Sequence, residues 1–154
     1  MRAKYKKLTT EQLDTVLSGL EPLKTLPIPP KGWVRAVRDA LGMSARQLAQ
    51  RLGVKQQRIV RIEQDEKQGK VTLNTLQNVA EAMDCIFVYG LVPRESLQQT
   101  IQEQARRAAI KRMSRSNQMM RLEKQELTAP QKQKALHEMI EEILNTMPRT
   151  LWDE

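Results

Sequence analysis

The chain has 154 residues, which suits one ordinary domain with extensions, and 40% of them are hydrophobic, which is enough to form a core. Lys and Arg outnumber Asp and Glu by 26 to 18, and the resulting net charge of +8 favours a polyanionic partner. The single cysteine excludes an intramolecular disulfide and a cysteine-cluster metal site. No apolar run approaches the length of a membrane span, and the start lacks a signal-peptide core, so we expect a cytoplasmic protein.

The positive charge is concentrated in two segments. Residues 31–70 hold 10 basic and 4 acidic side chains, and residues 94–125 hold 8 and 3. The last segment, residues 126–154, is acidic, with 3 basic and 6 acidic side chains. Charge alone does not separate DNA from RNA or an anionic membrane, but the low aromatic content of 3% disfavours RNA because no stacking platform is present.

Residues 1–31 are predicted to form an N-terminal helix and a proline connector. Residues 1–8 carry no core pattern, so we expect them to be frayed. Thr9, with Gln12 three residues later, forms a capping-box pattern that predicts a helix to about Leu20. The apolar stripe of this helix favours packing on the main core over binding a partner. The prolines that follow predict a stiff, extended connector.

Residues 32–93 carry the patterns of a compact helical domain. Apolar spacing predicts a first helix over residues 32–41, with the inward side chains Trp33, Val34, Val37 and Leu41. Residues 44–63 then predict two short helices joined by a tight turn. Ser44 is expected to cap the first of them, and Gly53 to end it in the left-handed conformation.

The second helix of this pair is predicted to bury Ile59 and Ile62, so its opposite face is exposed to water or to a ligand. That face carries Gln56, Gln57, Arg58 and Arg61. An outer face of Gln and Arg is typical of a recognition helix in the DNA major groove, because Gln bonds an adenine edge and Arg a guanine edge through two atoms. The alternative is a small helical core with a solvated polar face, but two adjacent amides among arginines favour DNA binding.

These patterns predict two groups of DNA contacts. Base contacts are expected from Gln56, Gln57 and Arg61. Phosphate contacts are expected from Ser44, Arg46, Lys55, Arg58, Lys67, Lys70 and Thr72. Residues 64–70 are expected to form a charged loop before a helix that Thr72 or Asn74 begins, where the positive helix end could hold a phosphate. A plain solvated loop explains Lys67 and Lys70 nearly as well.

A β-rich run follows this helix, which is predicted to extend to about Met83 with Leu73, Leu76, Val79, Ala80 and Met83 inward. Residues 85–92 predict one β-strand, stopped by Pro93. A lone strand leaves its amides and carbonyls unpaired, so either an unrecognised segment or a second copy of the chain pairs with it. Antiparallel pairing with a two-fold mate would give a homodimer. The expected dimer-strand residues are Ile86, Phe87, Val88 and Tyr89.

Residues 94–154 are predicted to form a helical C-terminal extension. A long helix over residues 95–125, interrupted near residues 114–117, carries Arg106, Arg107, Lys111, Arg112 and Arg115. These basic residues could grip a phosphate backbone or could simply be solvated, and the sequence favours neither. Thr128 with Gln131 predicts the cap of a last helix whose apolar stripe spans residues 136–147. Packing on the chain's own long helix is the default for this stripe, and docking onto another protein is the alternative.

No pattern supports an enzyme. The single histidine, His137, has no second histidine with which to bind a metal, and no glycine-rich phosphate loop occurs. No serine or cysteine has a credible base. We therefore expect neither catalytic residues nor a cofactor.

The stretches RDALGMSARQLAQRLGV and QQRIVRIE resemble the phage-repressor class of helix-turn-helix proteins, the XRE family. The resemblance implies a mainly α, lambda-repressor-like bundle, to which the predicted strand and the helical N- and C-terminal extensions are added. It implies an ion pair between Arg38 and Glu63, and base contacts from Gln57 and Arg61. The family usually has a Gln where this chain has Ala45, so phosphate contact at that end falls to Ser44, Arg46 or backbone amides.

The wider chain resembles a narrower group, mobile mystery protein A, through PIPPKGW, MDCIFVYGLVP, EQARR and the closing LWDE. That group resembles antitoxin-like regulators encoded beside a Fic-domain protein. The resemblance implies a dimeric, sequence-specific DNA-binding regulator that represses its own operon, and paired helix-turn-helix readers imply a palindromic operator. The alternative is a protein-binding inhibitor of the Fic-domain partner, with DNA binding secondary.

Overall fold

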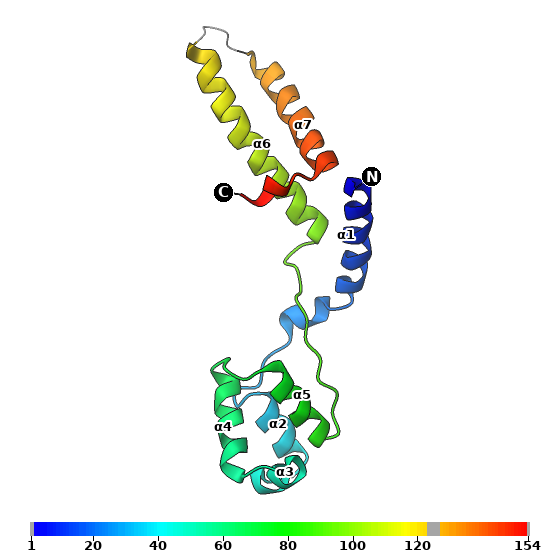
Figure 1. Ribbon diagram of the computed structural model, residues 1–154, viewed down its shortest axis with the longest axis vertical. Coiled ribbons are helices and arrows are strands. Elements are labelled where there is room, and N and C mark those ends of the chain that lie inside the picture. Colours follow the sequence, from blue (N-terminus) through cyan, green and yellow to red (C-terminus); the bar gives the residue numbers. More distant parts are fainter. Residues whose placement is uncertain (1, 123–126, 154) are drawn as a thin grey trace. The chain divides into compact units, whose positions relative to one another are not determined.

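The computed structural model describes residues 2–122 and 127–153, and the chain divides into two compact units (Figure 1). We call residues 23–90 the central unit, and residues 1–22 together with 91–154 the terminal unit. The elements in chain order are α1 (Arg2–Ser18), the 3-10 helix η1 (Glu21–Thr25), α2 (Trp33–Ala40), α3 (Ala45–Leu52), α4 (Gln56–Lys67), α5 (Leu73–Ala82), α6 (Leu97–Leu122), α7 (Ala129–Thr146) and the 3-10 helix η2 (Arg149–Trp152).

The core of the central unit lies between α2, α3, α4 and α5. Its buried side chains are Val34, Leu48, Ala49, Ile59, Ile62, Val79 and Met83. The predicted inward positions of Ile59 and Ile62 are therefore confirmed. Trp33, Leu41 and Leu73 were expected inside but are exposed. Trp33 and Leu73 are the first residues of their helices and Leu41 follows the last residue of α2, so all three lie at helix ends.

The turn between α3 and α4 forms as its sequence predicts. The Ser44 hydroxyl accepts a hydrogen bond from the backbone N–H of Gln47 at 3.2 Å, and the Ser44 N–H donates to the Gln47 side-chain oxygen at 2.8 Å. This reciprocal capping box fixes the start of α3. Gly53 adopts φ 67° and ends α3, and the Val54 N–H closes the turn on the Ala49 carbonyl at 3.0 Å.

Two carboxylates of α4 bond to α2. Arg38 Nε donates to Glu63 Oε1 at 2.7 Å, as the family resemblance implies, and both side chains are buried. Glu66 accepts hydrogen bonds from the backbone N–H groups of Trp33 at 2.8 Å and Val34 at 3.0 Å, so it caps the N-terminus of α2. Gly32 adopts φ 83°, and a Cβ there would lie 2.8 Å from Glu66 Oε2. This position therefore requires glycine.

In the terminal unit, α7 packs along α6 (Figure 1). The buried residues are Ala105 and Ala109 of α6, Ile143 of α7 and Leu151 of η2. Around them pack Ile101, Ala108, Leu136, Met139, Ile140, Leu144 and Met147. The apolar stripe of α7 therefore lies on the chain's own long helix, which confirms the default prediction.

The N-terminal helix also belongs to the terminal unit, where it packs on α6 and α7. The Asp14 carboxylate accepts hydrogen bonds from the backbone N–H groups of Leu97 at 2.7 Å and Gln98 at 3.0 Å, which caps α6. Lys6 Nζ donates to the Met147 carbonyl at 3.2 Å beyond the end of α7. The prediction that this helix covers the main core is therefore wrong.

Three predicted boundaries are also wrong. The helix α1 begins at Arg2, and Thr9 lies inside it, where its hydroxyl donates to the Tyr5 carbonyl at 2.9 Å instead of starting a capping box. The helix α4 continues to Lys67, so the expected charged loop is shorter than predicted. Residues 114–117 do not interrupt α6, which is continuous to Leu122. The predicted cap of α7 does form, because the Thr128 N–H donates to Gln131 Oε1 at 2.9 Å.

The predicted β-strand over residues 85–92 is not present, and no strand occurs in residues 2–122 or 127–153. From Ile86 to Val92 no backbone group bonds to the backbone of another described residue. A strand requires a ladder of hydrogen bonds with a neighbour, and β-branched composition alone does not supply one. The side chains of Ile86, Val88 and Tyr89 are exposed, and the Phe87 ring stacks on that of Tyr89 at 6.0 Å.

We expect Arg38→Met to lower the free energy of unfolding of the central unit by about 3–5 kcal/mol, because Glu63 is left buried without its partner. The pair is nearly enclosed, with side-chain exposures of 10% and 9%. Urea denaturation measures the effect through Trp33 fluorescence in a Trp152→Phe background. The matched control is Arg35→Met on the same helix, which breaks a half-exposed pair with Asp39 (3.8 Å) and should cost less than about 1 kcal/mol. Equal losses in the two variants would contradict a structural role for Arg38.

Candidate nucleic-acid interface

The outer face of α4 presents polar side chains around an open hollow of about 530 Å³. The lining residues are Gln56, Gln57, Val60, Arg61, Gln64 and Asp65. The inner face of the same helix buries Ile59, Ile62 and Glu63. Because the inner face is held in the core and by α2, the rotation of α4 about its axis is fixed and the outer face points to solvent. This division matches that predicted from the sequence.

Gln56 and Gln57 are the first two residues of α4, and both are exposed. Their side chains make no hydrogen bond with any described residue, so both amides are free to bond a ligand. Recognition helices contact base edges mainly with their N-terminal residues, which is where these amides lie. Each amide offers a donor and an acceptor, which is the pair of groups that an adenine edge complements.

Arg61 lies one turn further along the same face, and its side chain is 75% exposed. Its Nε is 3.8 Å from Asp65 Oδ2, an i,i+4 contact on the helix surface. An exposed pair of this kind is weak, so the guanidinium can exchange Asp65 for a base edge at little cost. In the unbound protein Arg61 thus lies beside Asp65 on the outer face.

The predicted phosphate contacts are all exposed: Ser44, Arg46, Lys55, Arg58, Lys67, Lys70 and Thr72. None of the five basic residues among them forms an ion pair with a described residue, so their charges are available to a polyanion. The Thr72 hydroxyl already accepts the backbone N–H of Thr75 at 3.2 Å as the N-cap of α5, and Ser44 has the same role in α3. These two residues place helix N-termini next to the basic side chains, and backbone amides at such ends favour phosphate.

Behind this face, the contact with Glu63 favours the charged form of Arg38. The hydrogen bond from Arg38 to Glu63 raises the pKa of the Arg38 guanidinium, burial opposes this rise, and the attraction of Glu63 and Asp39 adds to it. Arg38 Nη1 also donates to the Met43 carbonyl at 2.8 Å, just before α3 begins. One guanidinium therefore joins α2, α4 and the start of α3.

Sequence reasoning missed two residues that support the interface. Glu66 was not singled out by the sequence, although its carboxylate caps the N-terminus of α2. Glu66 meets its partners 32 and 33 residues away, which no local pattern reveals. Gln47 was missed although its spacing from Ser44, S-x-x-Q, is the capping-box pattern and was sufficient to find it.

Comparison with known families gives one match to part of the chain. A family model described as Helix-turn-helix matches residues 34–86. Comparisons with curated proteins and with solved structures find no match. Within residues 2–122 and 127–153, no helix is long and apolar enough to cross a membrane. Residues 34–86 are therefore similar to helix-turn-helix domains, in agreement with the packing of α3 and α4 described above.

Proposed function

We propose that this chain is a sequence-specific transcription regulator that reads duplex DNA with α4. The observation that carries the proposal is the pair of free amides, Gln56 and Gln57, on the exposed face of a helix whose other face is locked into the core. In this proposal Gln56, Gln57 and Arg61 contact bases. Ser44, Arg46, Lys55, Arg58, Lys67, Lys70 and Thr72 contact phosphates. The helix-turn-helix family match over residues 34–86 supports the same function.

The rigid placement of α4 favours sequence-specific contacts with bases over nonspecific binding to DNA. A side chain helps to discriminate between DNA sequences only if it is held opposite one base pair, because a mobile side chain can bond to several base pairs. The hydrogen bonds of Glu63 and Glu66 to α2 provide that register at two points along α4. The phosphate contacts then orient the domain without reading sequence.

We further propose that the protein represses its own operon, as the resemblance to antitoxin-like regulators implies. The DNA to test is the duplex immediately upstream of the gene that encodes the chain. Protection of a discrete site there, in a footprinting experiment with the full-length protein, supports self-regulation. Uniform protection along the duplex would show that the binding is nonspecific and would contradict self-regulation.

Gln57→Ala should weaken binding to the protected site by about 1–3 kcal/mol and remove the preference at one base-pair position of each half-site. The loss is local because one bidentate contact reads one base pair. Fluorescence anisotropy on duplexes with each base pair changed in turn measures the effect. The matched control is Gln133→Ala, an exposed amide on α7, which should leave every value unchanged. A Gln57→Ala variant with the full wild-type base preference would show that this amide reads no base.

Lys70→Ala should weaken binding evenly across sequences, because a phosphate contact carries no base information. The slope of log K against log salt should fall in magnitude by about 0.9 for the one lost contact. Titrations of matched and mismatched duplexes at several salt concentrations measure both quantities. Loss of preference at a single base pair would instead place Lys70 among the base contacts.

We also propose that the regulator is a homodimer that contacts its mate through Ile86, Phe87, Val88 and Tyr89. The side chains of Ile86 and Val88 are 91% and 75% exposed. They border a largely apolar groove of about 640 Å³ that includes Val79, Met83 and Phe87. Burying such a surface on a second copy is favourable, and two joined readers recognise paired half-sites.

Val88→Lys should shift the protein from dimer to monomer in sedimentation equilibrium, because a lysine placed in an apolar contact loses its hydration. It should also weaken binding to a two-half-site duplex far more than to a single half-site. Val16→Lys is the matched control, since Val16 on α1 is 68% exposed. A monomeric wild-type protein at micromolar concentration, or a Val88→Lys variant that stays dimeric, would contradict this interface.

The alternative function is inhibition of a Fic-domain partner, for which the apolar stripe of α7 is the candidate docking surface. That stripe packs on α6, with Ile143 fully buried. The surface that motivated partner binding is therefore occupied within the chain. We keep DNA binding as the proposed primary function.

A further inference from the structure

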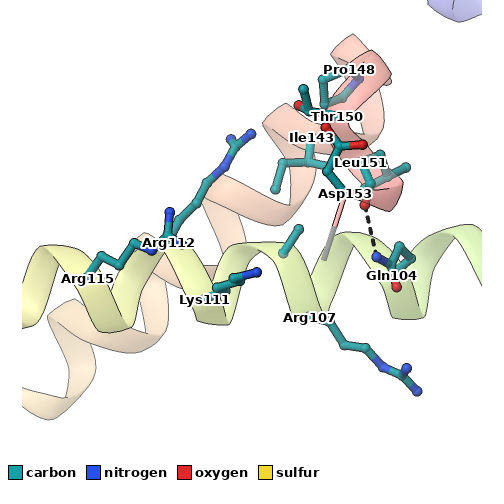
Figure 2. Close-up of a pocket in the computed structure, with 11 residues that line it drawn as sticks. Gln104, Arg107, Lys111, Arg112, Arg115, Ile143, Pro148, Thr150, Leu151 and Asp153 are labelled. Carbon is teal, nitrogen blue, oxygen red and sulfur yellow. Dashed lines mark hydrogen bonds between the residues drawn. The ribbon is translucent and has the colours of Figure 1, made fainter.

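A second basic surface lies on α6, in the terminal unit and apart from the residues assigned above. Four cationic side chains line one side of a hollow of about 440 Å³ there: Arg107, Lys111, Arg112 and Arg115. The opposite side is formed by residues of α7 and η2 (Figure 2). We call these four residues the α6 basic surface. All four are exposed.

The structure itself holds this surface outward. Ala105 and Ala109 of α6 are completely buried, so the helix cannot rotate without exposing them. Gln104 Nε2 donates to the Leu151 carbonyl at 2.9 Å, and Leu151 is buried, which fixes η2 against α6 (Figure 2). The helix that carries the α6 basic surface is thus held in place by its packing in the terminal unit.

The charges of this surface are mostly unbalanced. Arg107 has an acidic neighbour, Glu103, at 3.5 Å. The other three cations have no ion pair with any described residue, and Asp153 is the one carboxylate among the lining residues. Arg107, Lys111 and Arg115 follow one another at i,i+4 spacing, where like charges repel. An external anion would remove that repulsion.

The directions of the side chains indicate the kind of anion. Figure 2 shows Arg107 and Arg112 projecting to opposite sides of α6, with Arg115 further along the helix. The charged ends therefore spread over the helix surface and do not converge on the hollow. A small anion in a pocket would require convergent donors, whereas an extended row of phosphates matches a spread of exposed charges.

We propose that the α6 basic surface binds the phosphate backbone of duplex DNA without reading its sequence. This inference rests on the proposed function, because it assigns a second contact with the same polyanion. A linked second contact raises affinity through effective concentration. The sequence preference of α4 is unaffected, because phosphate contacts do not distinguish bases.

The test uses the full-length protein with the triple substitution Lys111→Gln, Arg112→Gln and Arg115→Gln. Binding to a selected-site duplex and to a random-sequence duplex is measured by anisotropy at several salt concentrations. The slope of log K against log salt should fall in magnitude by about 2–3, and affinity near physiological salt by about tenfold or more for both duplexes. The base preference should not change. Circular dichroism confirms that the helices remain intact.

Two matched variants make the result specific. Lys4→Gln, Lys7→Gln and Lys134→Gln remove the same charge from exposed positions outside the α6 basic surface, and should leave slope and affinity near the wild-type values. Lys111→Arg, Arg112→Lys and Arg115→Lys keep the charge and should keep the slope. Equal effects of the two neutralising triples, or no effect of the α6 triple, would overturn the proposal. A wild-type protein that binds duplexes without sequence preference would instead contradict the proposed function while leaving this surface in place.

Discussion

The central unit depends on two carboxylates of α4 that form hydrogen bonds with α2. Glu63 forms a buried ion pair with Arg38, and Glu66 caps the helix by accepting the N–H groups of Trp33 and Val34. They are three positions apart in the sequence (i,i+3), so both lie on one side of α4. A broken buried pair costs about 3–5 kcal/mol, a large part of the stability of a small domain. The same bonds that stabilise the domain therefore orient its outer face.

The terminal unit contains the same kind of helix-capping contact. Asp14 of α1 caps the first N–H groups of α6, as Glu66 caps α2. In both units a carboxylate from one helix satisfies the donors of another helix far away in sequence. Such a bond fixes the position of the capped helix end and complements its positive dipole. In each unit, exposed basic side chains thus lie on a helix whose buried residues are held in place.

The sequence predicted the parts of the fold that local patterns determine. The cap at Ser44, the left-handed Gly53 and the buried Ile59 and Ile62 all depend on residues within one or two helical turns. The predicted strand over 85–92 failed because strand formation depends on a partner that composition does not reveal. The packing of α1 on α6 and α7, and the cap that Glu66 provides, join distant segments and left no local signal. The exposed amides of α4 and the Arg38–Glu63 pair were predicted, whereas the second contact that orients α4, from Glu66 to the start of α2, was found only in the structure.

Selection of binding sites from a pool of random duplexes tests the central claim most directly. If α4 reads base edges as one of a pair, the enriched sequences will be palindromic, with half-site centres about one helical turn (~34–36 Å) apart. A variant with alanine in place of both Gln56 and Gln57 will then enrich a different or degenerate sequence. Enrichment of no sequence by the native protein, or of the same palindrome by the variant, would contradict base reading by these amides.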